Sequence, residues 1–253
     1  MLDGLKAFFH HGKRFIPDPT KVSLPESFTG LPKFISTPCL QDCSLCKNVC
    51  PTRAITTEPL RLALDSCIFC LECQDACPEH KIRFTNNYKM GTNQYERLQI
   101  AEGKENLVCV NPALVRNEIV RLLGRSLKLR LVSAGSCNGC ELELNAAGNV
   151  NFDMGRYGIE FVASPRHADG LVITGPITEN SLASVKLTYE AIPSPNVVIL
   201  VGACALSGGV FKESLALRRE ILSELKPDLL VPGCPPHPLT FINAILDLIK
   251  TKV

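Results

Sequence analysis

The second half of the chain alternates between short apolar runs and longer amphipathic runs. The apolar runs have the length of strands, and one of them, Asn196–Val201, is apolar almost throughout, as in strands buried on both faces of a parallel sheet. The predicted strands are Leu127–Ser133, Gly158–Ala163, Gly170–Thr174, Asn196–Val201 and Leu229–Val231. The predicted helices are Glu141–Ala147, Glu179–Ala191, Lys212–Leu225 and Pro238–Ile249. This alternation predicts an α/β domain with a doubly wound parallel sheet over residues 127–253.

The first 126 residues lack this alternation and divide into three segments. Residues 1–34 are expected to form an extended docking arm, because prolines recur from 15 to 38. The arm begins with a short amphipathic helix, which docks either on a protein or on a membrane surface. Its apolar residues are Leu2, Leu5, Phe8 and Phe9, and its basic residues are Lys6, His10, His11, Lys13 and Arg14. Residues 35–97 contain two cysteine runs, and 98–126 are a predicted helical linker in which Asn111-Pro112 starts a helix and Gly124 ends it.

Composition limits the classes of protein to which the chain can belong. With 253 residues and 45% hydrophobic content, the chain can bury more than one core. The formal net charge is only +2 and the basic residues are scattered, which gives no support to nucleic-acid binding. The longest apolar run, Val197–Leu206, is interrupted by Gly202 and is much shorter than the roughly 20 residues of a membrane span. No secretory or twin-arginine signal precedes the cysteine runs, so we expect an intracellular protein without a transmembrane segment.

Eight of the thirteen cysteines form two compact runs. From the second cysteine of the first run onward, each cysteine recurs 27 positions later, and a proline follows each run. This pattern resembles the C-x2-C-x2-C-x3-C-P repeat of bacterial ferredoxins, in which the fourth cysteine of each run binds the other cluster. The resemblance implies a bacterial-type 2[4Fe–4S] ferredoxin domain with two crossed ligand sets. These sets are Cys39, Cys43, Cys46 with Cys77, and Cys67, Cys70, Cys73 with Cys50.

Disulfides and structural zinc are the competing interpretations of these two runs. Disulfides need an oxidising compartment, and the paired CxxC motifs of zinc sites are separated by a longer loop and lack the Cys-Pro ending. The second run matches the ferredoxin pattern throughout, whereas three residues instead of two separate Cys39 from Cys43. We expect Cys39 to reach its cluster through the longer loop. The spacing leaves open a three-iron cluster or a shifted reduction potential.

Four further cysteines are spread through the predicted α/β domain. Cys137, Cys140, Cys204 and Cys234 follow the first, fourth and last predicted strands. The carboxyl ends of parallel strands meet at one rim, where open α/β sheets bind their ligands, and glycines near these cysteines let the backbone approach a bulky cofactor. We therefore expect a third site of four thiolates, the alternative being four buried core cysteines. Cys109, the thirteenth, lies between two valines and is predicted to be a buried structural thiol.

Four motifs between residues 127 and 250 strongly resemble the small subunit of energy-converting, group 4 [NiFe] hydrogenases of the formate hydrogenlyase type. The motifs are Ser136-Cys-Asn-Gly-Cys-Glu141, Ser164-Pro-Arg-His-Ala-Asp169, Gly202-Ala-Cys-Ala-Leu-Ser-Gly-Gly209 and Val231-Pro-Gly-Cys-Pro-Pro-His-Pro238. The complex I subunit that carries the terminal cluster is a more distant relative, with adjacent cysteines in place of Cys137-Asn-Gly-Cys140. Residues 1–100 resemble the separate two-cluster ferredoxin-like subunit of the same complexes. The chain thus joins a ferredoxin-like part to a flavodoxin-like α/β domain of the hydrogenase small-subunit and complex I 20 kDa type.

The resemblance implies an electron path through three [4Fe–4S] clusters. The set Cys137, Cys140, Cys204 and Cys234 would hold the proximal cluster, next to an active site in a hydrogenase-type large subunit. Glu141 would lie at that interface as a candidate for proton transfer, or alternatively serve as a carboxylate stabilised by a helix N-terminus. Arg166 and His167 would shape the interface or donate hydrogen bonds near the cluster. No residue of this chain is expected to be catalytic.

The same resemblance implies a set of partners and a location. The partners are the large subunit, further hydrophilic and integral membrane subunits, and an electron-donor protein or subunit. The expected location is peripheral, on the cytoplasmic side of the membrane. Nickel needs two CxxC pairs, and outside the ferredoxin repeats only Cys137/Cys140 forms such a pair. No GxGxxG or P-loop motif supports nicotinamide, flavin or nucleotide binding.

Three classes of function remain open from the sequence. The first is electron transfer in a membrane-associated [NiFe] hydrogenase that reduces protons or oxidises hydrogen. The second is the same relay in a nickel-free hydrogenase-related or complex I-like oxidoreductase that acts on quinones or sulfur species. The third is a free-standing ferredoxin fusion with a regulatory role.

Overall fold

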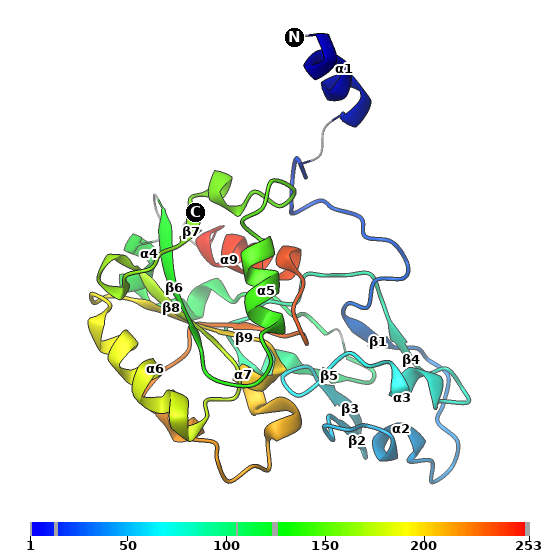
Figure 1. The fold of residues 1–253 in the computed structure, drawn as a ribbon. Helices are drawn as coiled ribbons and strands as arrows, with labels where there is room; N and C mark the ends of the chain where they lie inside the picture. Colours follow the sequence, from blue (N-terminus) through cyan, green and yellow to red (C-terminus); the bar gives the residue numbers. More distant parts are fainter. Residues whose placement is uncertain (1, 13–14, 105, 123–125, 251–253) are drawn as a thin grey trace.

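A five-stranded parallel sheet forms the centre of the second half of the chain (Figure 1). The computed structural model describes residues 2–12, 15–104, 106–122 and 126–250. Its sheet order is β10-β9-β8-β6-β7, which is the flavodoxin-like order with the direction of winding reversed between β6 and β8. The strands are β6 (Leu127–Ser133), β7 (Ile159–Phe161), β8 (Gly170–Thr174), β9 (Val197–Val201) and β10 (Leu229–Val231). The predicted fold class of this half is therefore confirmed.

Helices cover both faces of this sheet (Figure 1). Helices α5 (Gly139–Ala146) and α9 (Pro238–Lys250) pack on one face, where Leu144, Phe241 and Ile245 contact the apolar side chains of the strands. The opposite face is covered by α6, α7 and α8 together with side chains from the first half of the chain. These helices span Glu179–Ala191, Ala203–Ser207 and Leu222–Leu225. Because both faces are covered, all residues of β8, β9 and β10 are buried.

The cysteine-rich region consists of two small antiparallel sheets and two short helices. One sheet pairs β1 (Pro32–Phe34) with β4 (Ile82–Phe84). The other has the order β2-β3-β5, and its strands are Ile55–Thr57, Leu60–Ala63 and Gln99–Ala101. The bounds of two elements repeat after 27 residues: α2 (Leu45–Asn48) and β2 recur as α3 (Glu72–Asp75) and β4. Strands β1 and β5 lie outside the 35–97 range expected for this region.

The two halves share one apolar core and several polar contacts. A single cluster of buried side chains runs from Leu62 and Ile82 to Leu171 and Leu200 on the parallel sheet. Thr92 forms an antiparallel bridge to Leu230 of the edge strand β10, with N–H···O distances of 3.0 and 2.7 Å.

Close approach of the backbones accompanies this bridge. A side chain at Gly91 would meet the Cβ atom of Ala244 on α9 at 2.2 Å. Ser207 of α7 donates a hydrogen bond of 2.8 Å to the carbonyl oxygen of Asp65. The cysteine-rich region is therefore packed directly against the α/β half.

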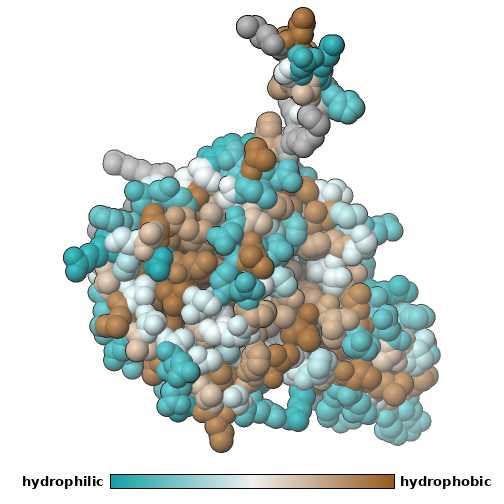
Figure 2. All heavy atoms as spheres, viewed as in Figure 1, coloured by the Kyte–Doolittle hydropathy of each residue, from teal (hydrophilic) through white to brown (hydrophobic). Residues whose placement is uncertain are grey.

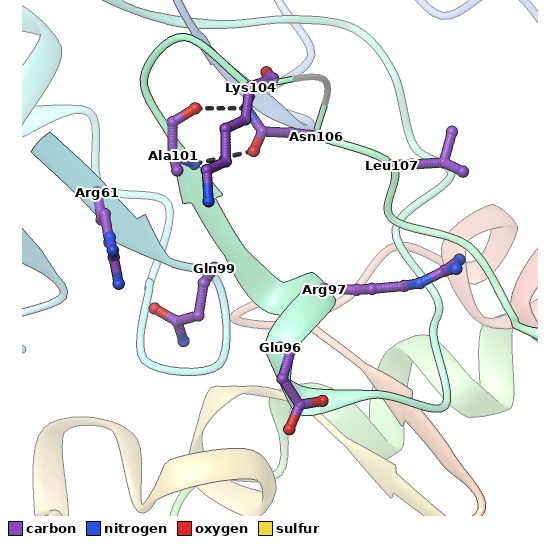
Figure 3. A pocket seen from close by; sticks show the side chains of 8 residues that line it. All are labelled: Arg61, Glu96, Arg97, Gln99, Ala101, Lys104, Asn106 and Leu107. Carbon is purple, nitrogen blue, oxygen red and sulfur yellow. Dashed lines mark hydrogen bonds between the residues drawn. The ribbon is translucent and has the colours of Figure 1, made fainter. Parts of the chain in front are cut away.

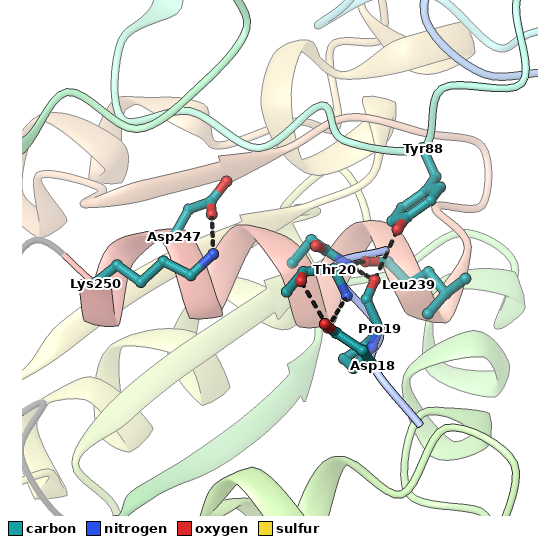
Figure 4. Close-up of polar contacts among 8 residues, drawn as sticks. Asp18, Pro19, Thr20, Tyr88, Leu239, Asp247 and Lys250 are labelled. Carbon is teal, nitrogen blue, oxygen red and sulfur yellow. Dashed lines mark hydrogen bonds and ion pairs between the residues drawn. The ribbon is translucent and has the colours of Figure 1, made fainter. Parts of the chain in front are cut away.

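The N-terminal arm is bound to the body through its backbone. The carbonyl oxygen of Pro19 accepts a hydrogen bond from Tyr88 Oη (2.8 Å), as seen in Figure 4. The same oxygen accepts a hydrogen bond from the buried Asn243 Nδ2 (2.7 Å). Helix α1 (Leu2–His11) precedes these anchors and stands away from the rest of the molecule (Figures 1 and 2). Phe8 and Phe9 are 67% and 79% exposed there. The short amphipathic helix predicted for this segment is thus present.

One predicted helix is wrong over most of its length. Of Lys212–Leu225, only Leu222–Leu225 is α-helical, preceded by the 3-10 turns Gly209–Phe211 and Arg219–Ile221. The loop between these turns forms backbone hydrogen bonds with residues distant in sequence instead. Glu179 N donates to Ala216 O, and Arg218 N donates to Ile177 O. These long-range partners outweigh the helical preference of the local sequence.

The linker is less helical than expected. It consists of a 3-10 turn at Pro112–Leu114, capped by the side chain of Asn111, and of α4 (Asn117–Leu122). The predicted stop at Gly124 lies outside the described residues. Within the described ranges, no helix is long and apolar enough to cross a membrane.

Candidate functional site

Two pockets of the cysteine-rich region each bring together four cysteines from both runs. The first pocket surrounds Cys39, Cys43, Cys46 and Cys77 and has an empty volume of about 340 Å³. The second pocket surrounds Cys50, Cys67, Cys70 and Cys73 and has an empty volume of about 300 Å³. In each pocket the fourth thiol comes from the other run. The two groups have the same membership as the crossed sets implied by the ferredoxin pattern.

The surroundings of the thiols are those of a site for a cluster with sulfide ligands. Backbone N–H groups donate to three cysteine sulfur atoms: Ala54 N to Cys50 Sγ (3.2 Å), Phe69 N to Cys67 Sγ (3.4 Å) and Lys81 N to Cys77 Sγ (3.3 Å). Hydrogen bonds of this kind stabilise thiolates that bind iron. Burial raises the pKa of Cys67 and Cys73 to about 12. Without a metal, these two thiols therefore stay protonated at neutral pH, and binding of iron releases their protons.

Left-handed backbone conformations shape both cysteine loops. Asp42 (φ 53°) and Phe69 (φ 57°) occupy equivalent positions of the repeat, each directly before a cysteine. Leu71 is also left-handed (φ 69°), whereas its counterpart Ser44 has φ −126°. The two loops therefore follow different paths, in keeping with the extra residue between Cys39 and Cys43.

The third group of cysteines lies at the carboxyl end of the parallel sheet. Cys137 lies between β6 and α5, Cys140 in the first turn of α5, Cys204 in α7, and Cys234 between β10 and α9. The pKa of Cys140 is raised to about 12, chiefly by burial, then by the charge of Glu141 and by the charges of the other three thiols. The sequence thus predicted the common rim correctly. Cys137 and Cys234 are exposed, and Cys140 and Cys204 are half-buried, so these are not core cysteines.

Glycines leave room beside these thiols. A side chain at Gly202 (φ 90°) would bring its Cβ atom to 2.6 Å from Cys140 Sγ, and one at Gly209 would lie 3.1 Å from Cys204 Sγ. The hydroxyl of Ser136 lies 3.9 Å from Cys204 Sγ. Below the cysteines, the half-buried Arg219 donates to the carbonyl oxygens of Ala205 (2.9 Å) and Leu206 (2.8 Å) at the end of α7. This guanidinium fixes the short helix that carries Cys204.

Glu141 is hydrogen-bonded to the parallel sheet. Its Oε1 accepts a 2.7 Å hydrogen bond from the buried hydroxyl of Thr174, and its Oε2 is buried without a hydrogen-bond partner in the described structure. Both Glu141 and Arg130, whose Nε is likewise buried without a partner, line a polar pocket beside β7. An unsatisfied carboxylate oxygen in a polar pocket is available for a proton or a donor group. The proton-transfer role of Glu141 stays a prediction.

The remaining sequence-predicted residues are Arg166, His167 and Cys109. Arg166 and His167 are exposed in the 3-10 turn Pro165–His167, beside β6 and α6. Cys109 is half-buried rather than buried, which corrects the prediction. Its flanking valines fill the core instead, and Arg97 reaches its sulfur atom (2.8 Å) and its carbonyl oxygen (3.1 Å).

Lys81 is a residue at the site that the sequence interpretation missed. Its side chain is buried beside the first pocket and contacts Glu102 and the carbonyl oxygen of Thr37. A signal was present in the repeat, because Lys81 occupies the position that Ala54 has 27 residues earlier. A charged residue in place of a buried alanine marks a local difference between the two pockets.

The largest groove among the pockets described here contains no cysteine (Figure 3). It has an empty volume of about 930 Å³ and lies along β5. Inside it the carboxamide of Asn106 bonds to both the N–H and the C=O of Ala101, each at 2.9 Å. These bonds satisfy an edge strand, as a neighbouring strand would. Its lining is Arg61, Glu96, Arg97, Gln99, Ala101, Lys104, Asn106 and Leu107.

The donor sets of the two pockets fit iron–sulfur clusters. Among the described residues, no group of three or more Cys, His, Asp or Glu side chains is arranged to hold a metal ion. Each pocket instead spaces four sulfur donors around an open volume and supplies N–H groups to them. Thiolate sets of four are the usual ligands of [4Fe–4S] clusters.

Comparisons with known proteins match the α/β half of the chain to a family model and to relatives from several complexes. A model of the family described as "NADH ubiquinone oxidoreductase, 20 Kd subunit" matches residues 137–248, a range that includes the four cysteines of the third group. The chain is 43% identical over 129 residues to a probable membrane-bound hydrogenase subunit, mbhJ, of Pyrococcus furiosus. That match covers 51% of this chain and 77% of the relative.

Two further relatives belong to different complexes. Formate hydrogenlyase subunit 7 of Escherichia coli is 36% identical over 144 residues, with 56% of each chain covered. A subunit of the NADH-quinone oxidoreductase of Geotalea daltonii is 43% identical over 109 residues, covering 43% of this chain and 64% of the relative. A solved structure of the membrane-bound sulfane sulfur reductase, an archaeal respiratory membrane complex, matches with 27% identity and a TM-score of 0.44. It covers 53% of this chain and 74% of the matched chain.

Proposed function

The chain belongs to the family of the 20 kDa subunit of NADH ubiquinone oxidoreductase, and on that premise we propose that it is an electron-transfer subunit of a membrane-associated oxidoreductase complex. The subunit carries iron–sulfur clusters and relays electrons; the chemical reaction takes place in a partner. The observation that carries this proposal is the grouping of twelve cysteines into three sets of four, two in pockets and one at the rim of the sheet.

The finer proposal is a chain of three [4Fe–4S] clusters. The first and second pockets hold two of them, and Cys137, Cys140, Cys204 and Cys234 hold the third. The second pocket is the middle of the relay, because Asp65, two residues before Cys67, is hydrogen-bonded to Ser207, three residues after Cys204. Pro51 and Thr52, which follow Cys50, line a common groove with Gly209 beside Cys204. Electrons therefore pass between the first pocket and the rim through the second pocket.

The proposed partner at the rim is the large subunit of a [NiFe] hydrogenase, which reduces protons or oxidises hydrogen. Support comes from the hydrogenase names of two relatives and from Cys137-Asn-Gly-Cys140, which resembles the hydrogenase branch rather than the adjacent cysteines of complex I. A nickel-free oxidoreductase acting on quinones or sulfur species is the second candidate, favoured by the relatives of the NADH-quinone oxidoreductase type. Both candidates use the same relay.

The proposed place of the chain is the cytoplasmic face of a membrane, as a peripheral subunit. Helix α1 and the arm that follows it are the proposed contacts with further subunits, because the large apolar side chains of α1 are exposed. Leu2, Leu5, Phe8 and Phe9 are each more than half exposed. Exposed apolar residues on a projecting helix mark a surface for binding.

Metal content of the anaerobically purified chain tests the relay. We expect about twelve iron and twelve acid-labile sulfide atoms per chain, from three four-iron clusters. Eight iron atoms together with zinc would contradict the three-cluster proposal. Eleven iron atoms would assign a three-iron cluster to the first pocket.

A variant of the rim separates the relay from the partner. In Cys234→Ala, we expect the loss of one cluster signal in electron paramagnetic resonance, while both pocket clusters remain reducible and no longer exchange electrons with the partner. An unchanged spectrum would contradict the assignment of Cys234.

Gentle solubilisation of membranes should recover the chain with a large subunit, and nickel in that subunit decides between the two candidates. A native chain that migrates alone with full electron-transfer activity would contradict the proposed complex.

A further inference from the structure

Lys81 is a buried lysine next to the first pocket. Its relative exposure is 1%, and it is the one charged residue classed as buried among the described residues. Burial of an ammonium group is unfavourable unless the charge is paired and hydrogen-bonded. A buried lysine at this position therefore needs partners that compensate for the loss of hydration of its ammonium group.

The Lys81 ammonium has two partners from different segments. Its Nζ forms an ion pair of 2.5 Å with Glu102 Oε1, just after β5, and donates a hydrogen bond to the carbonyl oxygen of Thr37. The Glu102 side chain is 42% exposed, so water reaches the anion while the cation is enclosed. The backbone N–H of Lys81 donates to Cys77 Sγ. One residue thus contacts a sulfur atom of the pocket, a charged partner and the segment that leads to Cys39.

The segment before Cys39 is held by Lys81 as far as Thr37. Phe34 pairs with Ile82 in the β1–β4 ladder, and Ile35 N donates to Lys81 O at 2.9 Å. The contact from Lys81 Nζ to the Thr37 carbonyl continues this attachment two residues further, beyond the end of the strand. Only Pro38 separates this attachment from Cys39. Cys39 begins the loop to Cys43, which has one more residue than the ferredoxin pattern.

The second pocket provides an internal comparison. Ala54 occupies the equivalent position, donates its N–H to Cys50 Sγ at 3.2 Å and has no charge. The loop from Cys67 to Cys70 has the regular spacing. The segment before Cys67 is fixed by its own backbone, with Cys67 N donating to Ala63 O at 3.0 Å. A lysine is therefore present where the cysteine loop is longer, and an alanine where the loop has the usual length.

We propose that Lys81 is a positioning residue for the first cluster, which holds the extended Cys39 loop in place and raises the reduction potential of that cluster through its enclosed positive charge. This inference rests on the proposed function, because it requires a cluster in the first pocket. Reduction adds one negative charge to the cluster. A cation held nearby in a poorly screened place stabilises the reduced form more than the oxidised form.

The charge of Lys81 lies close to the ligands of the first pocket. Its Nζ contacts the carbonyl oxygen of Thr37, two residues before Cys39, and its backbone N–H donates to Cys77 Sγ at 3.3 Å. Glu102 is the more exposed partner of the pair, so solvent screens the anion more than the enclosed cation.

Two variants test this inference in the full chain with its clusters assembled anaerobically. Lys81→Met removes the charge and the donor but keeps an unbranched side chain. We expect a lower midpoint potential for the first cluster, by about 59 mV or a tenfold change in the ratio of reduced to oxidised cluster, and a fraction of molecules with a three-iron signal. Glu102→Gln keeps Lys81 and its bond to Thr37 but removes the neutralising anion. We expect a higher midpoint potential and unchanged iron content.

Controls separate charge from general damage. Lys47→Met removes an exposed cation between Cys46 and Cys50 and should leave both midpoint potentials within error, because solvent screens that charge. Lys81→Arg should retain a four-iron first cluster. The signal of the second cluster, measured in the same redox titration, should be unaffected by every variant.

The outcomes distinguish this inference from the proposed function. If the unaltered chain lacks a cluster in the first pocket, the proposed ligand set itself is wrong. If that cluster is present and Lys81→Met changes neither its potential nor its iron content, Lys81 has no positioning role. If Lys81→Met and Glu102→Gln shift the potential in the same direction, the effect comes from disturbed structure and the proposed effect of charge is wrong.

Discussion

The first and second pockets share a repeat of 27 residues but offer different surroundings to their thiols. In the first pocket Cys46 is buried, Cys39 is exposed, and a buried ammonium lies next to the site. In the second, Cys67 and Cys73 are 7% and 6% exposed, and burial raises the pKa of both to about 12. The repeat gives both pockets a helix and a strand with equivalent bounds, while single residues within it determine burial and charge. Two sites of common pattern can thereby acquire different chemical properties.

The position of each pocket agrees with this difference. The second pocket faces the α/β half, to which it is joined through Asp65 and Ser207. Each pocket has one exposed thiol, Cys39 in the first and Cys70 in the second, but two thiols are buried in the second and only Cys46 in the first. The less buried first pocket suits exchange of electrons with a donor, and the more buried second pocket suits transfer within the protein.

Removal of the first cysteine in each run should have the largest effect and differ most between the pockets. In Cys67→Ala, we expect loss of about four iron atoms and of electron transfer to the rim, because a buried ligand of the middle cluster is missing. In Cys39→Ala, we expect loss of about one iron atom and a three-iron signal in electron paramagnetic resonance. Iron analysis and spectra of both variants check this. Equal losses would show that the two pockets tolerate a missing ligand alike.

Equivalent core positions should, in contrast, have equal effects. Ile55 and Ile82 lie at the same place in the repeat and are 2% and 1% exposed. Replacement of either by alanine should lower the free energy of unfolding by about 2–4 kcal/mol, through lost burial and a cavity. Anaerobic thermal or denaturant unfolding measures the pair. A difference of more than about 2 kcal/mol would mean that the halves of the repeat contribute unequally to the core.

A smaller effect is expected at a pair of left-handed residues. Arg53 (φ 52°) and His80 (φ 48°) are equivalent in the repeat, and glycine adopts this conformation without a steric penalty. We expect His80→Gly to raise the free energy of unfolding by about 0.5 kcal/mol, after the greater freedom of glycine in the unfolded chain is deducted. Arg53→Gly should gain less, because it also removes the exposed ion pair with Glu213. Unfolding in denaturant checks the order, and a larger gain for Arg53→Gly would contradict it.

The smallest effect should come from the cysteine outside all three groups. Cys109→Ala removes a sulfur acceptor of Arg97 but leaves the carbonyl acceptor of the same residue. We expect unchanged iron content and redox spectra in both pockets, and a loss of about 1 kcal/mol in the free energy of unfolding. The disappearance of any cluster signal would assign a ligand role to this thiol.

The sequence allowed the parallel sheet to be predicted because its strands are short, apolar and buried on both faces. Leu127–Ser133, Gly170–Thr174 and Leu229–Val231 were predicted with the bounds that the structure has. The loop at Lys212–Arg218 was mistaken for helix because its bonds go to Ile177 and Glu179, which are distant in sequence. Local periodicity contains no information about such partners.

The candidate site shows the same limit. Spacing and the ferredoxin pattern were sufficient to predict which cysteines gather in each pocket, since the ligand pattern is a property of the sequence. Lys81 was missed because its importance depends on enclosure by Thr37 and Glu102, segments that lie 44 and 21 residues away in sequence. Burial of a charge becomes visible only when the packing is known.

The bridge between Thr92 and Leu230 has a consequence for how the two halves stay together. Both halves belong to one chain, so this contact forms within a molecule, at an effective concentration of millimolar order for short connections. A junction made of this bridge and the shared apolar core then remains occupied however dilute the protein is. In two separate chains the same contacts would depend on protein concentration, and dissociation would leave β10 with an unpaired edge.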